Sequence, residues 1–233
     1  MIHYTHPSRI LVALDCIIFG FDGEELQVLL IKRNFEPEQG KWSLMGGFLN
    51  TDEDLEQAAQ RILYTLTGLT NHYLEQLQTF GAVQRDPVER TISVVYYALV
   101  NTRQQDLSAI RTHNAYWVNL REKPGLVFDH DEMVKQALRQ LRYKAALHAI
   151  GFELMPEKFT IPQLQKVYEA IYDTQLDRRN FSRKILSTDL LISTGEKDSL
   201  SVTKKGQLYR LNTEKYQQYL TDYVSFFPEL TLS

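Results

Sequence analysis

The stretch Lys41-Trp42-Ser43-Leu44-Met45-Gly46-Gly47-Phe48-Leu49 stands directly before the clearest helical pattern in the chain. The apolar residues that follow recur at the spacing of a single helix face, and they are Leu55, Ala58, Ala59, Ile62, Leu63 and Leu66. Thr51 with Asp54 three residues later predicts where this helix starts, and Gly68 predicts where it stops. We therefore expect a loop that leads into one amphipathic helix.

Outward from this helix, β-rich runs occupy residues 10–19, 26–31 and 91–100. The first two runs are separated by Phe21-Asp22-Gly23-Glu24, and an Asp-Gly pair in this position is typical of a hairpin. A second helix is expected to begin at Asp129 or His130, with apolar residues from Met133 to Leu141 along one face. Strands mixed with helices in this way predict an α+β domain built on a mixed sheet.

The last third of the chain has a different pattern. Gly and Pro in residues 151–156 indicate a domain boundary, so we expect one domain over residues 1–150 and another over residues 151–233. Ile161-Pro162 opens a helix, a second helix runs from about Asp177 to Ser187, and short strands are expected at residues 190–193 and 207–211. Helix, turn, helix and hairpin in this order predict a winged helix-turn-helix.

The second of these helices is basic on its outer side. The residues expected to bind DNA are Arg178, Arg179, Asn180, Arg183 and Lys184 on the helix, with Lys204 and Lys205 near the base of the wing. Arg and Asn can form paired hydrogen bonds with base edges in the major groove. On a helical wheel Arg178 falls toward the inner side, which makes it the weakest member of the set. A solvated helix face, or a winged helix that binds protein, is the alternative.

The composition of the whole chain fits two ordinary globular domains. Of its 233 residues, 43% are hydrophobic, and the formal net charge of −3 means that DNA binding has to depend on the local distribution of charge. Cys16 is the only cysteine and lies in an apolar run, which favours a buried hydrophobic role. The sequence has neither a signal peptide pattern nor an apolar run of membrane-spanning length, so we expect a cytoplasmic protein with no membrane partner.

The loop and helix around residues 41–69 resemble the signature of the Nudix family. Gly47, Glu53, Arg61, Leu63 and the pair Gly68-Leu69 match that signature. Its three remaining acidic positions are occupied by Ile62, Thr65 and Leu66.

This departure decides the chemistry that we expect. In Nudix hydrolases those carboxylates hold Mg²⁺ against a pyrophosphate, and a hard divalent cation requires oxygen ligands. Glu53 and Glu56 remain, but two carboxylates near one end of the helix cannot replace the missing set. The sequence therefore predicts no catalytic residue, no metal and no cofactor.

Four further runs resemble the Nudix-related transcriptional regulators, and the resemblance extends over nearly the whole chain. They are residues 84–87 (QRDP), 127–130 (VFDH), 159–164 (FTIPQL) and 176–181 (LDRRNF). The resemblance implies a dimeric, bacterial, DNA-binding regulator whose Nudix-like domain senses a small molecule. One branch of the family answers to ADP-ribose and controls NAD metabolism, and another answers to L-arabinose.

The effector is expected to bind in the pocket of the Nudix-like domain. The residues that we expect to contact it are Lys32, Trp42, Arg85, Asp86, Glu89 and His130. Because an apolar stripe replaces the region where a metal would help to neutralise a pyrophosphate, a neutral sugar, L-arabinose, is favoured over a nucleotide sugar. A regulator of NAD metabolism that responds to ADP-ribose, and an active Nudix hydrolase, are the alternatives.

The expected partner is a double-stranded operator bound by a homodimer. The long helix over residues 131–149 lies between the two domains in the sequence, so we expect it to carry the effector signal.

Overall fold

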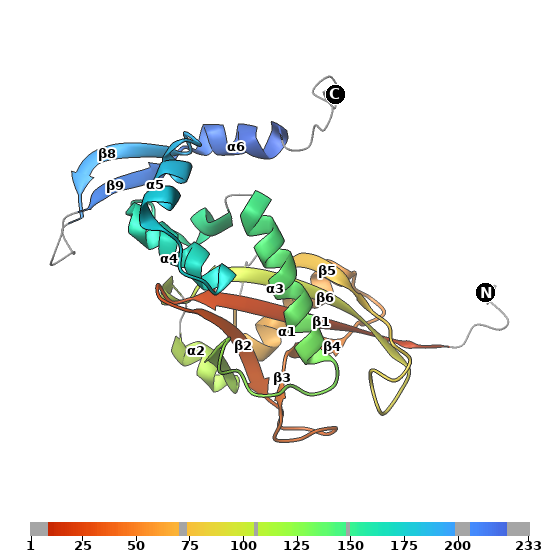
Figure 1. The fold of residues 1–233 in the computed structure, drawn as a ribbon. Coiled ribbons are helices and arrows are strands. Elements are labelled where there is room, and N and C mark those ends of the chain that lie inside the picture. The colour runs from red at the N-terminus through yellow and green to blue at the C-terminus, as the bar shows by residue number, and fades with distance from the viewer. Residues whose placement is uncertain (1–8, 70–73, 105–106, 148–149, 199–205, 223–233) are drawn as a thin grey trace. The chain divides into compact units, whose positions relative to one another are not determined.

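The computed structural model describes residues 9–69, 74–104, 107–147, 150–198 and 206–222 (Figure 1). The chain divides into two compact units, one formed by residues 1–22 and 26–140 and the other by residues 23–25 and 141–233. This division falls within one helix, and the domain boundary at residue 150 stays a prediction. Each unit has a hydrophobic core of its own.

The first unit is built on a mixed sheet. Its strands are β1 (Leu11–Phe21), β2 (Leu26–Lys32), β3 (Trp42–Ser43), β4 (Met45–Phe48), β5 (Glu75–Phe80), β6 (Thr91–Asn101) and β7 (Ala115–Asn119). The main strand order is β3-β2-β1-β6-β5, while β4 also pairs with β1 and β7 with β2. Strand β1 runs parallel to β6 along its full length, and the other pairs are antiparallel. The predicted hairpin forms between β1 and β2, with Gly23 at a positive φ of 98°.

Helix α1 (Leu55–Thr67) is the helix that the apolar spacing predicts. It begins three residues later than expected, because Asp54 rather than Thr51 is its N-cap. The Asp54 side chain accepts from Gln57 N–H, and the Gln57 side chain accepts from Asp54 N–H. Gly68 ends the helix in the left-handed conformation at φ 74°, which confirms the predicted stop.

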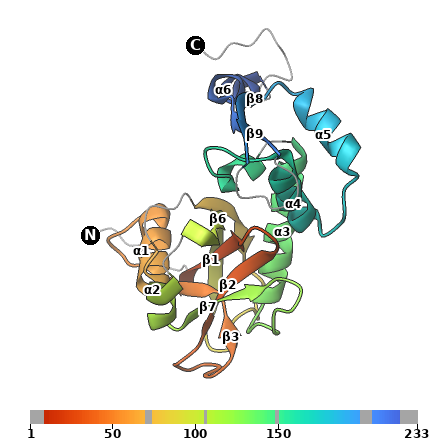
Figure 2. The same ribbon diagram turned by 90° about the vertical axis from the view of Figure 1, so that its left-hand side faces the viewer.

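Helices α1 and α3 (His130–Leu147) cover opposite faces of the sheet, as Figure 2 shows for the part of α3 in the first unit. The buried face of α1 packs against alternate residues of β1, among them Leu14, Cys16 and Ile18. This arrangement follows from the alternation of side chains along a strand, which supplies one apolar row to each face. The short helices η1 (Thr102–Gln104) and α2 (Leu107–Thr112) complete the first unit.

The second unit contains the predicted winged helix. After η2 (Ile150–Leu154) come α4 (Ile161–Tyr172), α5 (Arg178–Leu186), the antiparallel strands β8 (Leu191–Lys197) and β9 (Gln207–Leu211), and α6 (Thr213–Asp222). Thr160 and Gln163 form a capping box for α4, and Asp177 caps α5 by accepting from Asn180 N–H. Strand β8 is longer than predicted, and α6 was not predicted from the sequence.

Among the described residues, no helix combines the length and the apolar character needed to cross a membrane.

Candidate functional site: an ionic cavity and a basic helix

A cavity of about 350 Å³ opens in the first unit, a volume typical of small-molecule sites. Its charged and titratable lining consists of Asp15, Arg33, Glu36, Arg85, Asp86 and His130. These side chains come from β1, from the loop after β2, from the loop between β5 and β6, and from the first residue of α3. The sheet register and the start of α3 therefore bring together residues that are more than 100 positions apart.

His130 is a buried histidine of the cavity, and burial and hydrogen bonding both bear on its protonation state. The ring is 4% exposed, and its Nδ1 accepts a hydrogen bond of 3.1 Å from Leu44 N–H. Because Nδ1 is an acceptor, a neutral ring carries its proton on Nε2, which lies 3.5 Å from Oδ1 of Asp15. Burial lowers the pKa of His130, and the negative charge of Asp15 opposes this shift. The structure thus favours the neutral imidazole.

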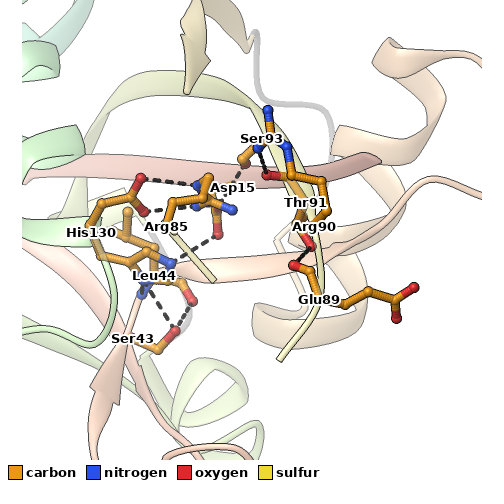
Figure 3. Close-up of polar contacts among 10 residues, drawn as sticks. Asp15, Ser43, Leu44, Arg85, Glu89, Arg90, Thr91, Ser93 and His130 are labelled. Atoms are coloured by element: carbon orange, nitrogen blue, oxygen red, sulfur yellow. Dashed lines mark hydrogen bonds and ion pairs between the residues drawn. The ribbon is translucent and has the colours of Figure 1, made fainter. Parts of the chain in front are cut away.

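Arg85 joins two of the four runs that carry the family resemblance, residues 84–87 and 127–130. Its Nε and Nη2 donate to the two carboxylate oxygens of Asp129 over 3.0 and 2.8 Å, and Nη2 also lies 3.6 Å from Oδ2 of Asp15 (Figure 3). The same Asp15 oxygen accepts from Ser93 Oγ over 2.6 Å. The positive charge of Arg85 is therefore offset by two carboxylates.

Arg33 is the second cation that lines the cavity. Its guanidinium carbon lies 4.3 Å from the ring centre of Phe35 and 5.4 Å from that of Phe128, both within range of a cation–π interaction. Its Nε donates to the carbonyl of Pro37 over 2.8 Å. Phe128 has a positive φ of 55°, which is strained for an aromatic residue and holds its ring against both Arg33 and His130.

The structure brings three of the six expected effector residues to the cavity: Arg85, Asp86 and His130. Asp86 is half-buried, and its Oδ1 accepts from Val88 N–H over 2.8 Å. The other three, Lys32, Trp42 and Glu89, do not line it. The Trp42 ring packs edge-on against Tyr116, and the side chains of Lys32 and Glu89 are exposed. Whether any of the six binds the effector stays a prediction.

Sequence reasoning missed Asp15, Arg33 and Phe128. A signal for Asp15 was present, because it is the only charged residue in the apolar run from Val12 to Phe19, and an isolated carboxylate in a central strand usually has a partner. Arg33 follows the expected Lys32 directly, and the alternation of a strand decides which of the two faces the cavity. Phe128 lies in the run 127–130 that carries the family resemblance, but the sequence pattern did not predict its place at the cavity, because that place depends on an unusual backbone conformation.

The two glycines of β4, Gly46 and Gly47, lie close to other residues of the first unit. A Cβ on Gly46 would lie 2.4 Å from Oδ1 of Asp15, so a side chain there would collide with the buried carboxylate. A Cβ on Gly47 would lie 3.0 Å from Ile62, which is 2% exposed. Ile62 therefore fills core space at a position where the Nudix signature has an acid.

Glu53, the remaining acid of the Nudix signature, already accepts hydrogen bonds from neighbouring residues. Arg61 donates to both carboxylate oxygens of Glu53 over 2.8 and 2.6 Å, and Asn50 N–H donates to Glu53 Oε1 over 2.8 Å. The Arg61 contact lowers the pKa of Glu53 to about 2. Among the described residues, no group of three or more His, Cys, Asp or Glu is placed to hold a metal ion. The side chains at this site do not fit Mg²⁺.

Helix α5 presents a basic outer face, as the sequence indicated. Arg178, Arg179, Asn180, Arg183 and Lys184 are all exposed, while Ile185 is buried and Phe181 half-buried. Arg183 Nη2 donates to Asn180 Oδ1 over 3.0 Å, which orients two of the expected base-reading side chains together. Arg178, placed toward the inner side by the helical wheel, is exposed because α5 begins there. Lys204 and Lys205 lie outside the described residues.

Comparison with known proteins gives matches to both units. The NUDIX domain model matches residues 9–137, and the model of the NrtR DNA-binding winged helix domain matches residues 151–211. The chain is 34% identical over 215 residues to a protein of Acinetobacter baylyi named "ADPR responsive transcriptional repressor NtrR", covering 91% of this chain and 85% of the relative. It is 32% identical over 137 residues to an ADP-ribose pyrophosphatase of Methanocaldococcus jannaschii, covering 58% of this chain and 76% of the relative.

The solved structures of NrtR from Shewanella oneidensis are also similar. The complex of that protein with a 27mer DNA has a TM-score of 0.73 and 31% identity, covering 88% of this chain and 95% of the other. The complex of its NUDIX domain with ADP ribose has a TM-score of 0.51 and 32% identity, covering 57% of this chain and 90% of the other.

Proposed function

The chain belongs to the NrtR family, with a Nudix domain followed by an NrtR winged helix domain, and on that premise we propose that it is a transcriptional repressor that responds to ADP-ribose. The observation that carries this proposal is the combination of an ionic, partly aromatic cavity in one unit with an exposed basic helix in the other. In this proposal residues 1–150 sense the effector and residues 151–233 bind the operator as part of a homodimer.

Helix α5 is the proposed recognition helix. Its cap at Asp177 and its buried Ile185 fix its inner side, so that the exposed Arg and Asn side chains are available for base edges. The Shewanella oneidensis relative was crystallised with DNA, which supports the same use of the matching domain here. Two such helices in a dimer would contact half-sites about 10 or 20 base pairs apart.

ADP-ribose replaces the neutral sugar that the sequence favoured. None of the three relatives described above is named for a sugar response, whereas two are named for ADP-ribose and one has a NUDIX domain crystallised with it. The argument for a sugar depended on the apolar stripe on α1, which does not line the cavity, and it did not include Arg33, which does.

Hydrolysis is the second candidate function, because a relative over the Nudix domain is an ADP-ribose pyrophosphatase. Ile62 and Leu66 offer no oxygen to a metal, and Glu53 is already bound by Arg61. A Nudix reaction requires a metal to activate water and to stabilise the charge that develops on the diphosphate. We therefore propose that the Nudix unit binds its ligand without cleaving it.

One set of measurements tests these proposals. Duplexes selected from a random pool by the purified protein are titrated at several salt concentrations, with and without ADP-ribose or L-arabinose. We expect binding that weakens steeply with salt and that changes with ADP-ribose only. Incubation with ADP-ribose and Mg²⁺ is expected to release no AMP. Sequence-independent binding would contradict the proposal of a specific operator. A response to arabinose would contradict ADP-ribose as the effector, and AMP release that a chelator abolishes would contradict binding without cleavage.

A further inference from the structure

The cavity contains one guanidinium group whose charge is not offset by direct contact with a carboxylate. Within the described ranges, the Arg33 guanidinium contacts the carbonyl of Pro37 and the rings of Phe35 and Phe128. No acidic residue of the described part lies within ion-pair distance of it. Its terminal nitrogens Nη1 and Nη2 thus keep their hydrogen-bonding capacity for a ligand.

The other cation of the cavity, Arg85, already contacts carboxylates of the protein. Arg85 is 8% exposed, forms a paired contact with Asp129 and lies 3.6 Å from Asp15. If Arg85 turned toward an anionic ligand, two carboxylates would lose their partner in a buried place, at considerable cost. Burial lowers the pKa of His130, which favours a neutral ring with no positive charge to offer. The cavity therefore has Arg33 as its available positive charge among the residues described.

The guanidinium group of Arg33 is also fixed in orientation before a ligand binds. The hydrogen bond from Nε to Pro37 fixes one edge of the guanidinium plane, and the two rings restrict its faces. An arginine constrained in this way loses less side-chain entropy when it binds a phosphate than a free one would. Arg also matches the paired oxygens of a phosphate group better than lysine does.

We infer that Arg33 binds the diphosphate of the effector directly, with no metal ion between them. This inference rests on the proposed function, in which the effector is ADP-ribose. It accounts for how a diphosphate can bind in the cavity although, among the described residues, no group of acids there is placed to hold a metal ion. Asp15, Glu36 and Asp86 also line the cavity, and their negative charges oppose the binding of a diphosphate. The positive charge of Arg33 is therefore required to offset this repulsion.

Calorimetric titration of the full-length protein with ADP-ribose, with and without EDTA, tests the inference. We expect the same affinity in both buffers, and a loss of about 10- to 100-fold in Arg33→Gln, the range of one or two charge-assisted hydrogen bonds. Arg33→Lys keeps the charge but not the paired geometry, so its affinity should be intermediate. Lys41→Gln is the matched control, because it removes an exposed positive charge from the same loop outside the cavity lining. A thermal melt of each variant without ligand reports whether it is folded.

Inorganic pyrophosphate serves as a second probe and separates the two levels of the argument. If ADP-ribose binds the wild type but Arg33→Gln binds it equally well, or if EDTA abolishes binding, the inference is wrong and the proposed function stands. If the wild type binds pyrophosphate but not ADP-ribose, and Arg33→Gln loses pyrophosphate, the proposed function fails and the anion site remains. If the wild type binds neither probe, both proposals are overturned.

Discussion

Arg85 donates two hydrogen bonds to the carboxylate of Asp129, although the two residues are 44 positions apart. The pair joins the loop between β5 and β6 to the residue before α3, and Asp15 on β1 lies beside it. A link of this kind fixes one wall of the cavity and the start of α3 at the same time.

Replacing Arg85 should therefore destabilise the first unit. Arg85→Met leaves Asp129 and the buried Asp15 without their cation, and we expect a loss of about 2–4 kcal/mol in the free energy of unfolding. Urea titration followed by circular dichroism measures this loss. Arg90→Met is the control in the same loop, because Arg90 donates to backbone carbonyls and not to a carboxylate, and it should cost about 1 kcal/mol. Equal losses of unfolding free energy in the two variants would contradict a stabilising role for the contacts of Arg85 with carboxylates.

The buried imidazole of His130 predicts a pH dependence of stability. Its pKa is lowered in the folded state, so below its ordinary value of about 6.5 the unfolded chain binds a proton that the folded chain does not. The contribution of His130 is thus fully present above pH 6.5 and is lost as the pH falls toward its lowered pKa, with a slope of at most about 1.4 kcal/mol per pH unit. Urea titrations between pH 5 and 8 should show this slope in the wild type and a smaller one in His130→Gln. The exposed His113→Gln should behave as the wild type does.

The apolar replacements on α1 predict that a metal site cannot be restored by substitution alone. Ile62→Glu would place a carboxylate in the core against Gly47, and we expect a loss of about 3 kcal/mol or more. Thr65→Glu, at an exposed position, should be tolerated to within about 0.5 kcal/mol. Thermal unfolding compares the two variants. An Ile62→Glu protein as stable as the wild type would show that this position can accommodate an acid.

The basic face of α5 predicts separate effects on affinity and on sequence preference. Arg183→Ala should weaken binding to the selected duplex by about 1–3 kcal/mol and relax the preference at one base pair. Fluorescence anisotropy with the selected duplex and its single-base variants measures both effects. Arg111→Ala, an exposed charge on α2 of the first unit, should leave both unchanged. A loss that is the same on every duplex would reassign Arg183 to phosphate contact.

Helix α3 offers a pair of arginines that tests the proposed signal path. Arg142 Nε donates to the Ile171 carbonyl near the end of α4 over 2.8 Å, whereas Arg139 Nη1 donates to Gln136 Oε1 on the same helix. Arg142→Gln should reduce the effect of ADP-ribose on operator affinity and leave ADP-ribose affinity itself unchanged, and Arg139→Gln should change neither. Anisotropy titrations with and without ADP-ribose give this coupling. If Arg142→Gln keeps the full response, α3 does not carry the signal through this contact.

The amino-acid pattern alone determined the elements that follow local rules. Helical spacing located α1, α3, α4 and α5 to within a few residues, because apolar periodicity and caps act over a single turn. The change at Ile62, Thr65 and Leu66 was also readable directly, since a metal site depends on residue type at fixed spacing. The exposed basic side of α5 followed from the same periodicity.

Only the tertiary structure decided which side chains line the cavity. Arg33 rather than Lys32 faces it because strand alternation sends neighbouring residues to opposite sides, and the correct side depends on the register of the sheet. Asp15, Arg85, Asp129 and His130 meet through pairing of β1 with β6 and through the position of α3, which are contacts over long stretches of chain. Spacing alone therefore did not show that Arg33 lines this cavity, the observation that supports the proposal of an anionic effector.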